Sequence, residues 1–359
     1  MATEVVTTTQ VQVSGKKKGP PPPLGPFSLP VAASPKSIKK AVLIFNPVSG
    51  GKKGKKRVDK IVIPMFQAAG AELVLLPTER PGHATELAKT CDLTGVDALL
   101  ACGGDGTLSD VATGFLTRAS AEDVVMGFIP SGTGNTVMHD ILGARPKADK
   151  GVRTAVEVIL AGRTRKIDCC KVESTSVDGS PLVRHSINIV TAGLGVDANA
   201  AAEKRRWMGP LRYDFSIITE LLKIGKRKPL PCTLGIDGQD SELDLFVLTI
   251  MNNKHSGVGL RLSPYAQMDD GKIDLMYTPK PIKKVGTALR LDGMIKKKGI
   301  HVNDPLVAYS TASSTITLTS QANPVRIMCD GDSCGFTPLN MTVLKNALTI
   351  LTPENPGPC

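Results

Sequence analysis

The sequence predicts an α/β domain with a doubly wound parallel sheet, followed by a domain that is a mostly antiparallel β-sandwich. The length of 359 residues suits two domains of about 100–200 residues each. Short apolar runs alternate with segments of helical period up to about residue 165. Beyond that point, short strands separated by turn residues predominate. We therefore expect a disordered tail over residues 1–38, the α/β domain over 39–165 and the β-rich domain over 166–355.

The amino-terminal tail carries much of the positive charge. Six lysines and one glutamate among residues 1–40 give +5 of the total net charge of +11. Three consecutive lysines and four consecutive prolines leave this segment too little apolar surface to form a core, which predicts disorder. The net charge favours a polyanionic partner, either nucleic acid, a nucleotide or anionic lipid. Aromatic residues make up only 4% of the chain, which argues against a surface on which nucleic-acid bases stack.

The first domain begins with an apolar run at residues 41–45, which is typical of a strand buried on both faces of a sheet. A turn follows, and apolar residues then recur at helical spacing from Val58 to Ala69, although Pro64 favours a kink there. The alternation continues with predicted strands at Glu72–Leu76, Asp97–Cys102 and Met126–Pro130, and predicted helices at Ala84–Thr90 and Thr107–Arg118. In such a sheet, ligands bind beyond the carboxyl ends of the strands.

The second domain is predicted from short strands separated by turns. They are Ile167–Val172, Ser186–Val190, Cys232–Ile236, Leu243–Met251, Lys272–Tyr277, Thr315–Thr319, Val325–Cys329 and Leu348–Leu351. Helical patterns remain mainly at Leu211–Ile224 and Ile282–Lys298. This arrangement predicts a mostly antiparallel β-sandwich.

The cysteines and the apolar runs indicate a cellular location. Eight cysteines neither form a dense framework nor show zinc-ligand spacing, and no secretory signal is recognisable. We therefore predict reduced thiols and a cytoplasmic protein. The longest apolar stretches, such as Leu243–Met251, are far shorter than the ~20 residues that span a membrane, so we expect any membrane association to be peripheral.

Three glycine-rich loops each follow a predicted strand of the first domain, at residues 46–53, 103–107 and 130–135. Glycine allows positive φ and lets backbone N–H groups approach a phosphate, which the positive end of the following helix also attracts. The Walker and GxGxxG patterns are absent, because Lys56 and Val137 stand where those patterns need Ser or Thr and Gly. Three loops at successive strand ends therefore predict a different kind of nucleotide phosphate site.

Asp105 lies between two glycines of the second loop. Beside a bound triphosphate, its carboxylate can accept a proton from an attacking hydroxyl or help to hold Mg²⁺. The alternative is that Asp105 caps the helix predicted to begin near Thr107. Because three phosphate loops accompany this residue, we favour the catalytic interpretation.

From Ala41 to Pro353 the sequence resembles the catalytic region shared by diacylglycerol, sphingosine and ceramide kinases. In the first domain the resemblance rests on Asn46-Pro47 with the following Ser-Gly-Gly, on Gly-Gly-Asp-Gly-Thr at 103–107 and on Pro-Ser-Gly-Thr-Gly-Asn at 130–135. In the second domain it rests on Ser263-Pro264 and on residues 203–209, 211–215, 269–275 and 329–332, of which 203–215 are similar to the sphingosine and ceramide kinase branch. The resemblance implies a phosphofructokinase-like nucleotide domain.

The resemblance also implies a role for each matching residue. Asp105 would be the catalytic base that takes the proton from a lipid hydroxyl, with ATP and Mg²⁺ as cofactors. Arg206 and Arg212 would reach the phosphates from the second domain, although without the resemblance a solvated helix face is the alternative. The residues implied to bind the nucleotide are Asn46, Pro47, Val48, Ser49, Gly50, Gly51, Thr78, Gly103, Gly104, Gly106, Thr107, Asp110, Gly132, Thr133, Gly134, Asn135, Arg206, Arg212, Asp330, Gly331 and Asp332. The resemblance does not specify which residues hold the metal.

Asp197 and Asn199 are implied to contact the lipid. In sphingosine kinases the position of Asn199 holds an Asp that reads the amine and hydroxyl of the sphingoid base, and a neutral amide lacks the charge that favours an ammonium group. The predicted function is nonetheless ATP-dependent phosphorylation of the primary hydroxyl of a sphingoid base, with ceramide or diacylglycerol as the alternative lipid. Less favoured alternatives are an NAD kinase-like enzyme, because that family also contains Gly-Gly-Asp-Gly-Thr, and a basic nucleic-acid-binding protein.

The expected partners are a lipid substrate and an anionic membrane surface, without nucleic acid, and a homodimer is left open. Basic clusters would suit docking on anionic lipid, although each is also typical of a solvated surface. These clusters are residues 52–56, 226–228, 283–284 and 296–298.

Overall fold

The computed structural model describes residues 25–357, with gaps at 33, 120–122, 210, 229, 258–259 and 298. Residues 1–24 of the predicted tail lie outside the described residues. In the described residues 25–32 and 34–38, the chain is bonded to both halves of the molecule. The Ser28 N–H donates to Asp269 Oδ1 at 2.5 Å, and the Lys36 N–H donates to the Gly162 carbonyl at 2.8 Å. These partners are distant in the sequence, so the composition of the tail could not reveal them.

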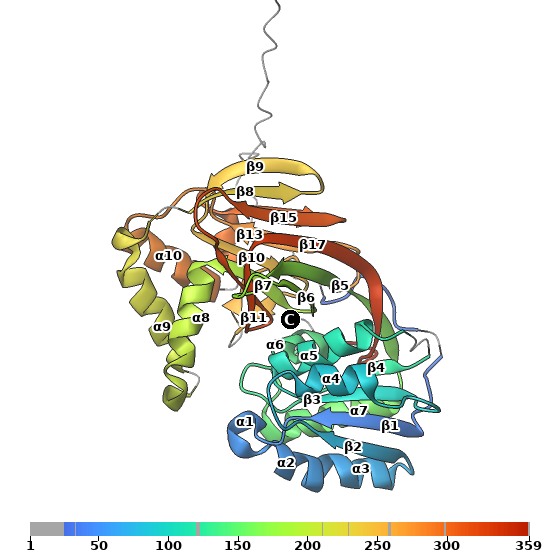
Figure 1. Cartoon of the computed structure of the whole chain (residues 1–359). Helices are drawn as coiled ribbons and strands as arrows, with labels where there is room; N and C mark the ends of the chain where they lie inside the picture. The colour runs from blue at the N-terminus through green and yellow to red at the C-terminus, as the bar shows by residue number, and fades with distance from the viewer. Residues whose placement is uncertain are drawn as a thin grey trace, which may run out of the picture.

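The first unit is the predicted doubly wound α/β domain (Figure 1). Its parallel strands stand in the order β4-β3-β1-β2. They are β1 (Lys40–Phe45), β2 (Glu72–Pro77), β3 (Ala98–Gly103) and β4 (Val125–Pro130). One face of the sheet packs against α4 (His83–Thr90), α5 (Asp105–Leu116) and α6 (Thr136–Leu142). The other packs against α7 (Ala148–Ala161), α3 (Ile63–Ala68) and the π-helical turn Val58–Val62.

The predicted helix from Val58 to Ala69 is helical from Val58 to Ala68. It follows two short helices, α1 (Ser49–Lys52) and α2 (Gly54–Arg57). Its π-helical turn directly precedes α3, whose second residue is Pro64, so the irregular turn lies where proline removes a backbone donor from the helix.

The second unit is mostly antiparallel, as predicted. Its strands are β5 (Thr164–Thr175), β6 (Pro181–Ser186), β7 (Ile189–Gly193), β8 (Pro231–Ile236), β9 (Gln239–Asp244), β10 (Val247–Met251), β11 (His255–Ser256), β12 (Leu260–Arg261), β13 (Ile273–Tyr277), β14 (Ala308–Ala312), β15 (Thr315–Ser320), β16 (Arg326–Cys329) and β17 (Asp332–Leu351). Its helices are α8 (Leu194–Glu203), α9 (Leu211–Leu222) and α10 (Val285–Lys296), with short 3₁₀ turns at Arg206–Met208, Ile224–Lys226 and Ile300–Asn303. Two of the predicted strands are divided by a turn in the structure. Ser186–Val190 includes the turn between β6 and β7, and Leu243–Met251 includes the turn between β9 and β10.

The last strand connects the two units. β17 has 20 residues, of which the sequence predicted only the final four. It pairs with β16 near Phe336, with β15 around Thr342, and antiparallel with β5 as far as Leu351. At Ile350 it also pairs in parallel with Met126 of β4. The carboxyl-terminal end of the chain therefore extends the first sheet, and one continuous sheet runs through both units.

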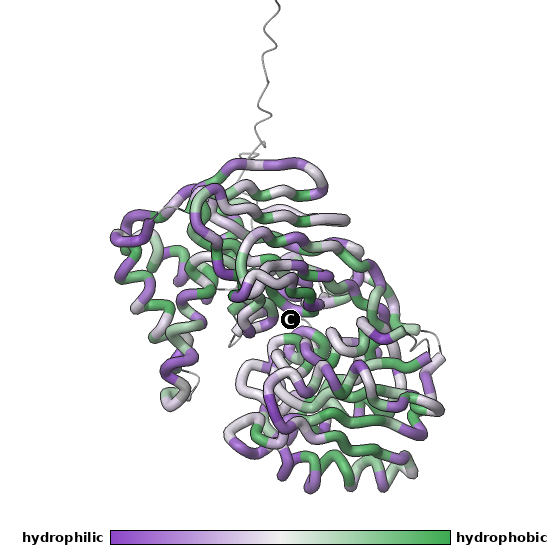
Figure 2. Tube along the Cα trace, viewed as in Figure 1, coloured by the Kyte–Doolittle hydropathy of each residue, from purple (hydrophilic) through white to green (hydrophobic). Residues whose placement is uncertain are grey.

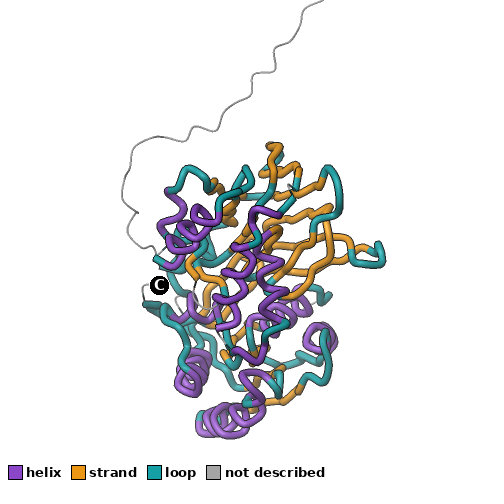
Figure 3. Tube along the Cα trace, turned by 90° about the vertical axis from the view of Figure 1, so that its left-hand side faces the viewer, coloured by secondary structure: helices purple, strands orange, loops and turns teal. Residues whose placement is uncertain are grey.

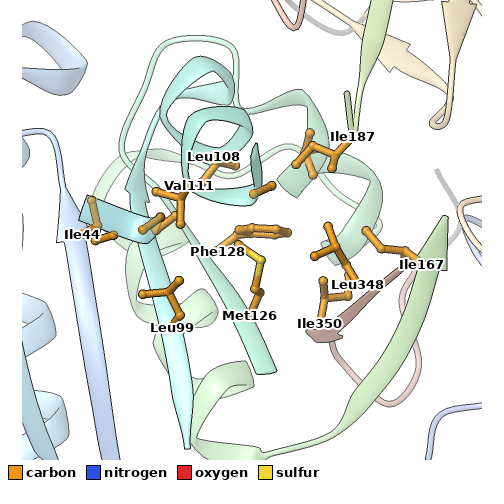
Figure 4. Packing of buried hydrophobic residues seen from close by; sticks show 14 of the residues in the cluster. Ile44, Leu99, Leu108, Val111, Met126, Phe128, Ile167, Ile187, Leu348 and Ile350 are labelled. Atoms are coloured by element: carbon orange, nitrogen blue, oxygen red, sulfur yellow. The ribbon is translucent and has the colours of Figure 1, made fainter. Parts of the chain in front are cut away.

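The core of the first unit lies between the sheet and the helices α4 to α6, and Phe128 lies near its centre (Figure 4). The Phe128 ring is almost fully buried among Leu108, Val111, Leu348 and their neighbours. Figure 2 shows hydrophobic residues concentrated along the inner strands of this unit and hydrophilic residues at the turns. Within the described part of the chain, no helix is long and apolar enough to cross a membrane.

Phe128→Ala should reduce the free energy of unfolding by about 3–5 kcal/mol, because the ring is removed from a packed core that can collapse only partly. Urea denaturation followed by circular dichroism measures the change. The matched control is Phe215→Ala, which removes the same side chain from an exposed position and should change stability by about 0.5 kcal/mol or less. Equal losses in the two variants would contradict the placement of Phe128.

Candidate active site

The three glycine-rich loops meet at one edge of the first sheet. The strands β1, β3 and β4 are parallel neighbours, so their carboxyl ends and the loops after them lie side by side (Figure 1). The N–H of Asn46 in the first loop donates to the carbonyl of Cys102 at 3.0 Å. The N–H groups of Ser131 and Gly132 in the third loop donate to the carbonyl of Gly103 at 2.7 and 2.9 Å. The structure thus brings together the loops that the sequence singled out.

Close backbone contacts between the loops require glycine at two positions. A Cβ atom on Gly132 would lie 2.3 Å from the Cα of Gly104. A Cβ atom on Gly50 would lie 2.2 Å from the carbonyl oxygen of Ser131, and Gly50 has a φ of 58°. Because these contacts involve backbone atoms, no side-chain rearrangement can make room for a larger residue. The resulting surface of closely packed backbone suits a phosphate group.

Polar side chains hold the loops in place from behind. The Ser49 hydroxyl donates to the Ser131 hydroxyl at 3.0 Å, and Arg57 Nη1 donates to the Ser131 carbonyl at 3.1 Å. Asn135 has a left-handed φ of 53°, and its Oδ1 accepts the Gly132 N–H at 3.0 Å. Ser49 and Asn135 therefore shape the loops. Sequence reasoning missed Arg57, which stands next to the basic cluster at 52–56 and was not distinguished from it.

Asp105 is the first residue of α5, and its carboxylate is directed toward a different helix. Its Oδ1 accepts the Val137 N–H, at the start of α6, at 3.2 Å. A Cβ atom on Gly134 would lie 2.8 Å from its Oδ2, so the third loop passes directly over the carboxylate. The alternative that Asp105 merely caps its own helix is not what the structure shows, because its hydrogen bond goes to α6.

The environment of Asp105 raises its pKa above the ordinary value. Withdrawal from water is the largest cause, and the nearby charge of Asp330 adds to it. The hydrogen bonds from Val137 and Thr136 favour the anion and act in the opposite direction. A carboxylate with a raised pKa is a stronger base, and this suits proton abstraction.

Two further carboxylates and an arginine lie beside the second loop. Arg184 Nη2 is 2.7 Å from Asp110 Oδ1 and 3.9 Å from Asp332 Oδ2. A Cβ atom on Gly106 would lie 3.2 Å from Asp332 Oδ2, so this carboxylate borders the loop that contains Asp105. Burial raises the pKa of Asp110, while the charge of Arg184 lowers it. Arg184, on β6, was not found from the sequence, because its partners are at least 74 residues away.

Asp330 supports the site without facing it. Its carboxylate is only 4% exposed and accepts hydrogen bonds from the Ser186 hydroxyl and from the N–H groups of Ile187, Asn188 and Ile189, at 2.7 to 3.2 Å. Both of its oxygens are therefore bonded to the turn between β6 and β7. In turn, Asn188 Nδ2 donates to Thr136 Oγ1 at 3.2 Å, at the start of α6. The sequence implied that Asp330 closes the nucleotide site, whereas in the structure its carboxylate is bonded to the turn that contacts the start of α6.

The other side of α6 is held by a second buried carboxylate. Asp140 Oδ2 accepts the N–H groups of Lys254 and His255 at 2.8 and 3.1 Å, and its Oδ1 lies 2.5 Å from His255 Nδ1. The His139 ring stacks on the His255 ring at 4.2 Å, and burial lowers the pKa of His139 to about 4. These residues join α6 to the second unit, and nothing in the sequence pattern had indicated them.

The residues implied to contact lipid lie on α8. Arg227 Nη2 donates to Asp197 Oδ2, so the charge of Asp197 is paired. Asn199 Nδ2 donates to the Gly331 carbonyl at 3.1 Å. Asn199 lines a cavity of about 300 Å³, together with Val196, Met328 and Asp332. Since Asp332 also borders the second loop, this cavity adjoins the loop that contains Asp105.

The remaining predicted residues either belong to the loops, support them or lie farther away. The Thr78 N–H donates to the Phe45 carbonyl at 2.9 Å, and Thr107 packs against Gly103. Arg212 Nη2 is 3.3 Å from Glu203 Oε1, and the side chain of Arg206 lies outside what the structure describes. The first loop includes Pro47, Gly51 and the exposed Val48, and the Val48 N–H donates to Asn46 Oδ1 at 3.0 Å. Thr133 lies in the third loop, and Gly331 directly precedes Asp332. A larger cavity of about 480 Å³, between α7 and the end of β17, contains none of the predicted residues.

Comparison with known proteins gives matches over both units. Residues 40–172 match the diacylglycerol kinase catalytic domain, and residues 188–352 match the YegS C-terminal NAD kinase beta sandwich-like domain. A diacylglycerol kinase of Staphylococcus carnosus is 27% identical over 326 residues, which cover 88% of this chain and 96% of that protein. Sphingosine kinase 2 of Arabidopsis thaliana is 27% identical over 314 residues, which cover 76% of this chain and 63% of that protein.

The fold is also similar to a solved structure. The crystal structure of a putative diacylglycerol kinase from Bacillus anthracis superposes with a TM-score of 0.68 and covers 89% of this chain and 97% of that chain. The two sequences are 24% identical. This likeness confirms the two-unit fold predicted from the sequence.

Gly132→Ala should lower the free energy of unfolding by about 1–3 kcal/mol, because the added methyl group collides with the backbone of Gly104. Thermal and urea denaturation measure the loss. Gly104→Ala is the matched control, because its Cβ atom would lie 3.4 Å from the nearest atom and Gly104 has a φ of −93°. If Gly104→Ala were the more damaging change, the described packing of the second and third loops would be incorrect.

Proposed function

We propose that this chain, which belongs to the lipid kinase family with a diacylglycerol kinase catalytic domain and a YegS C-terminal domain, phosphorylates the primary hydroxyl of a lipid with an uncharged head group. The observation that carries the proposal is the place of Asp105, between the third loop and the start of α6. The family uses ATP. The matches to diacylglycerol kinases favour a lipid kinase over the two alternatives, an NAD kinase-like enzyme and a nucleic-acid-binding protein.

In this proposal residues 39–165 bind ATP. Gly132 and Gly50 let the three loops pack closely backbone to backbone, and this exposed edge of glycine-rich backbone would face the phosphates. The residues of the three loops would provide N–H donors, and Arg57 would hold the third loop in position through Ser131. ATP supplies the phosphoryl group that is transferred.

Mg²⁺ would be held mainly by the nucleotide phosphates and by one or two carboxylates, of which Asp110 and Asp332 lie beside the second loop. Within the described residues, the group of three or more His, Cys, Asp or Glu side chains that are close enough to hold a metal together is His139, Asp140 and His255. His139 and Asp140 belong to α6, His255 bonds Asp140 and stacks on His139, and the three lie outside the proposed nucleotide site.

The chemical step requires a base at the lipid hydroxyl. Asp105 would accept the hydroxyl proton on its carboxylate, which burial has made more basic. The oxygen freed of its proton would attack the terminal phosphorus of ATP, and ADP would leave with the electron pair of the broken bond. Residues 166–355 would bind the lipid, and the cavity beside Asn199 would take its head group.

The contacts of α8 support an uncharged head group. Asn199 on the cavity wall is neutral, and the carboxylates of α8 are paired, Glu203 with Arg212 and Asp197 with Arg227. An ammonium group would therefore have to compete with an arginine for either carboxylate. Diacylglycerol and ceramide both offer a primary hydroxyl beside uncharged groups, so they fit these contacts better than a sphingoid base.

A sphingoid base, the substrate predicted from the sequence, stays the second candidate. It is favoured by the segment from Glu203 to Phe215, which resembles the sphingosine and ceramide kinase branch, and by the similarity to sphingosine kinase 2 of Arabidopsis thaliana. A panel of diacylglycerol, ceramide, sphingosine and phytosphingosine, assayed with labelled ATP and with product identification by mass, tests the two candidates. A strong preference for sphingosine would overturn the proposed head group.

Asp105→Asn should lower kcat about 10²–10⁴-fold, because the amide cannot accept the proton. In the unaltered protein, the raised pKa means that Asp105 becomes protonated, and can no longer act as a base, at a higher pH than an ordinary carboxyl group would. Activity should therefore decline as the pH falls through that raised pKa, since protonated Asp105 is inactive. Initial rates across the pH range measure both effects.

The control for this variant is Asp59→Asn, which removes an exposed carboxylate paired with Lys55 and should leave kcat unchanged. A full rate in Asp105→Asn, or an acidic limb at the pKa of an ordinary carboxyl group, would show that Asp105 is not the base.

Asn199→Asp should raise activity on sphingosine relative to diacylglycerol by about tenfold, because it adds an anion to the wall of the cavity. Competition assays with both lipids measure the ratio. The matched control is Asp197→Asn, which removes a carboxylate already paired with Arg227 and should leave the ratio nearly unchanged. The opposite pattern would assign recognition of the head group to Asp197.

A further inference from the structure

An exposed apolar face runs along α9 and the turn before it. Trp207 is 84% exposed, and Leu211, Phe215, Ile218 and Leu222 are 41 to 68% exposed. Among the described residues these five are close together in the chain, whereas most other exposed large apolar side chains are isolated. An exposed apolar patch of this kind indicates a surface that contacts a partner.

The spacing places this face opposite the buried side of the helix. Leu211, Phe215, Ile218 and Leu222 follow one another at intervals of four, three and four residues, which confines them to an arc of roughly 60° on the helix. Ser216 and Leu221 are buried, and Leu221 packs with Ile224, Phe246 and Leu291 in a small core. The side chains of the exposed face therefore take no part in packing α9 on its own unit.

α9 lies at the outer side of the second unit, beside α8 and α10 (Figures 1 and 3). A helix on the outside of a fold presents a convex ridge and not a groove. Its 12 residues give a ridge about 18 Å long. A narrow convex ridge with a tryptophan at one end suits insertion among lipid head groups, where the indole ring is favoured.

Lysines surround the carboxyl-terminal end of the ridge. Lys223, Lys226 and Lys228 are exposed just after Leu222. The exposed Lys283 and Lys284 are close in space, since a Cβ atom on Gly225 would lie 4.0 Å from the Lys283 carbonyl oxygen. This places two of the basic clusters noted in the sequence at one end of α9. Positive charge beside an apolar ridge complements an anionic lipid surface.

The ridge is connected to the cavity of the proposed site through α8. This helix carries Asn199 and Glu203 on the cavity wall, and Trp207 lies four residues after Glu203, in the 3₁₀ turn Arg206–Met208. The two helices are held together, because Arg205 Nη1 lies 3.4 Å from Ser216 Oγ and Arg227 bonds both Asp197 on α8 and Glu220 on α9. A lipid that leaves the bilayer along this ridge would therefore meet the wall of the cavity.

We propose that Trp207 and the exposed face of α9 insert into the interfacial layer of an anionic bilayer and so present membrane lipid to the cavity beside Asn199. The proposal rests on the proposed function, in that a lipid kinase takes its substrate from a membrane. It identifies the docking face and the chemistry of the partner, namely a bilayer with negatively charged head groups.

The experiment measures binding of the full chain to vesicles in the absence of ATP, by co-sedimentation. The vesicles contain either phosphatidylcholine alone or phosphatidylcholine with about 30% phosphatidylserine. The anionic lipid gives the second set of vesicles a negative surface potential. The double variant Leu211→Gln, Leu222→Gln should bind the anionic vesicles roughly tenfold or more weakly. Lys226→Glu should weaken binding to the anionic vesicles about fivefold and leave binding to the neutral vesicles unchanged.

The matched control is Val177→Gln, which replaces an apolar side chain that is 87% exposed at the turn between β5 and β6 and should leave vesicle binding unchanged. A second readout separates docking from catalysis. The α9 double variant should phosphorylate a short-chain, water-soluble lipid at the unaltered rate and vesicle lipid more slowly.

Each outcome decides the proposal. Unchanged vesicle binding by the α9 variant overturns it, as does equal loss in Val177→Gln. Conversion of a wild-type dimer to a monomer by the α9 substitutions, seen by light scattering, would assign the face to a second copy of the chain and also overturn it. Selective loss of anionic vesicle binding supports it even if no lipid in the panel is phosphorylated, in which case the proposed function alone fails.

Discussion

The buried carboxylate of Asp330 connects most of the site. It accepts hydrogen bonds from Ser186 and from three consecutive N–H groups, and so fixes the turn between β6 and β7. That turn bonds Thr136 through Asn188, and α6 in turn bonds the carboxylate of Asp105. A buried anion with four donors is costly to leave unpaired, so this arrangement resists displacement. The second unit thereby positions the proposed base of the first.

Close packing of backbone and a raised pKa arise from the same geometry. The second and third loops can touch only because Gly132 lacks a side chain, and the third loop then covers Asp105 through Gly134. Covering the carboxylate removes it from water, and this withdrawal is the main cause of its raised pKa. The glycines that suit phosphate binding therefore also make Asp105 more basic. The proposed base and the proposed nucleotide cradle depend on each other physically.

The helices of the second unit divide their surface between two roles. The inner side of α8 borders the cavity through Asn199. The negative charge of Asp197 on the same helix is paired with Arg227. α9 packs on α8 with its buried side and leaves an apolar ridge outside. Arg227 links the two helices, because it bonds carboxylates on both. Recognition of the head group and contact with a bilayer would thus be built on one rigid pair of helices.

The sequence by itself determined the fold class, the three loops and the place of Asp105 among them, because apolar periodicity and glycine spacing depend only on neighbouring residues. The tertiary structure decided that Ser28 and Lys36 bond to the body of the molecule, that β17 completes the first sheet, and that Arg184 pairs with Asp110. It also decided that Asp330 faces inward, bonded to residues more than 140 positions away. Such contacts leave no local pattern, since an aspartate that supports a turn and one that faces a ligand look alike until the chain around them is folded.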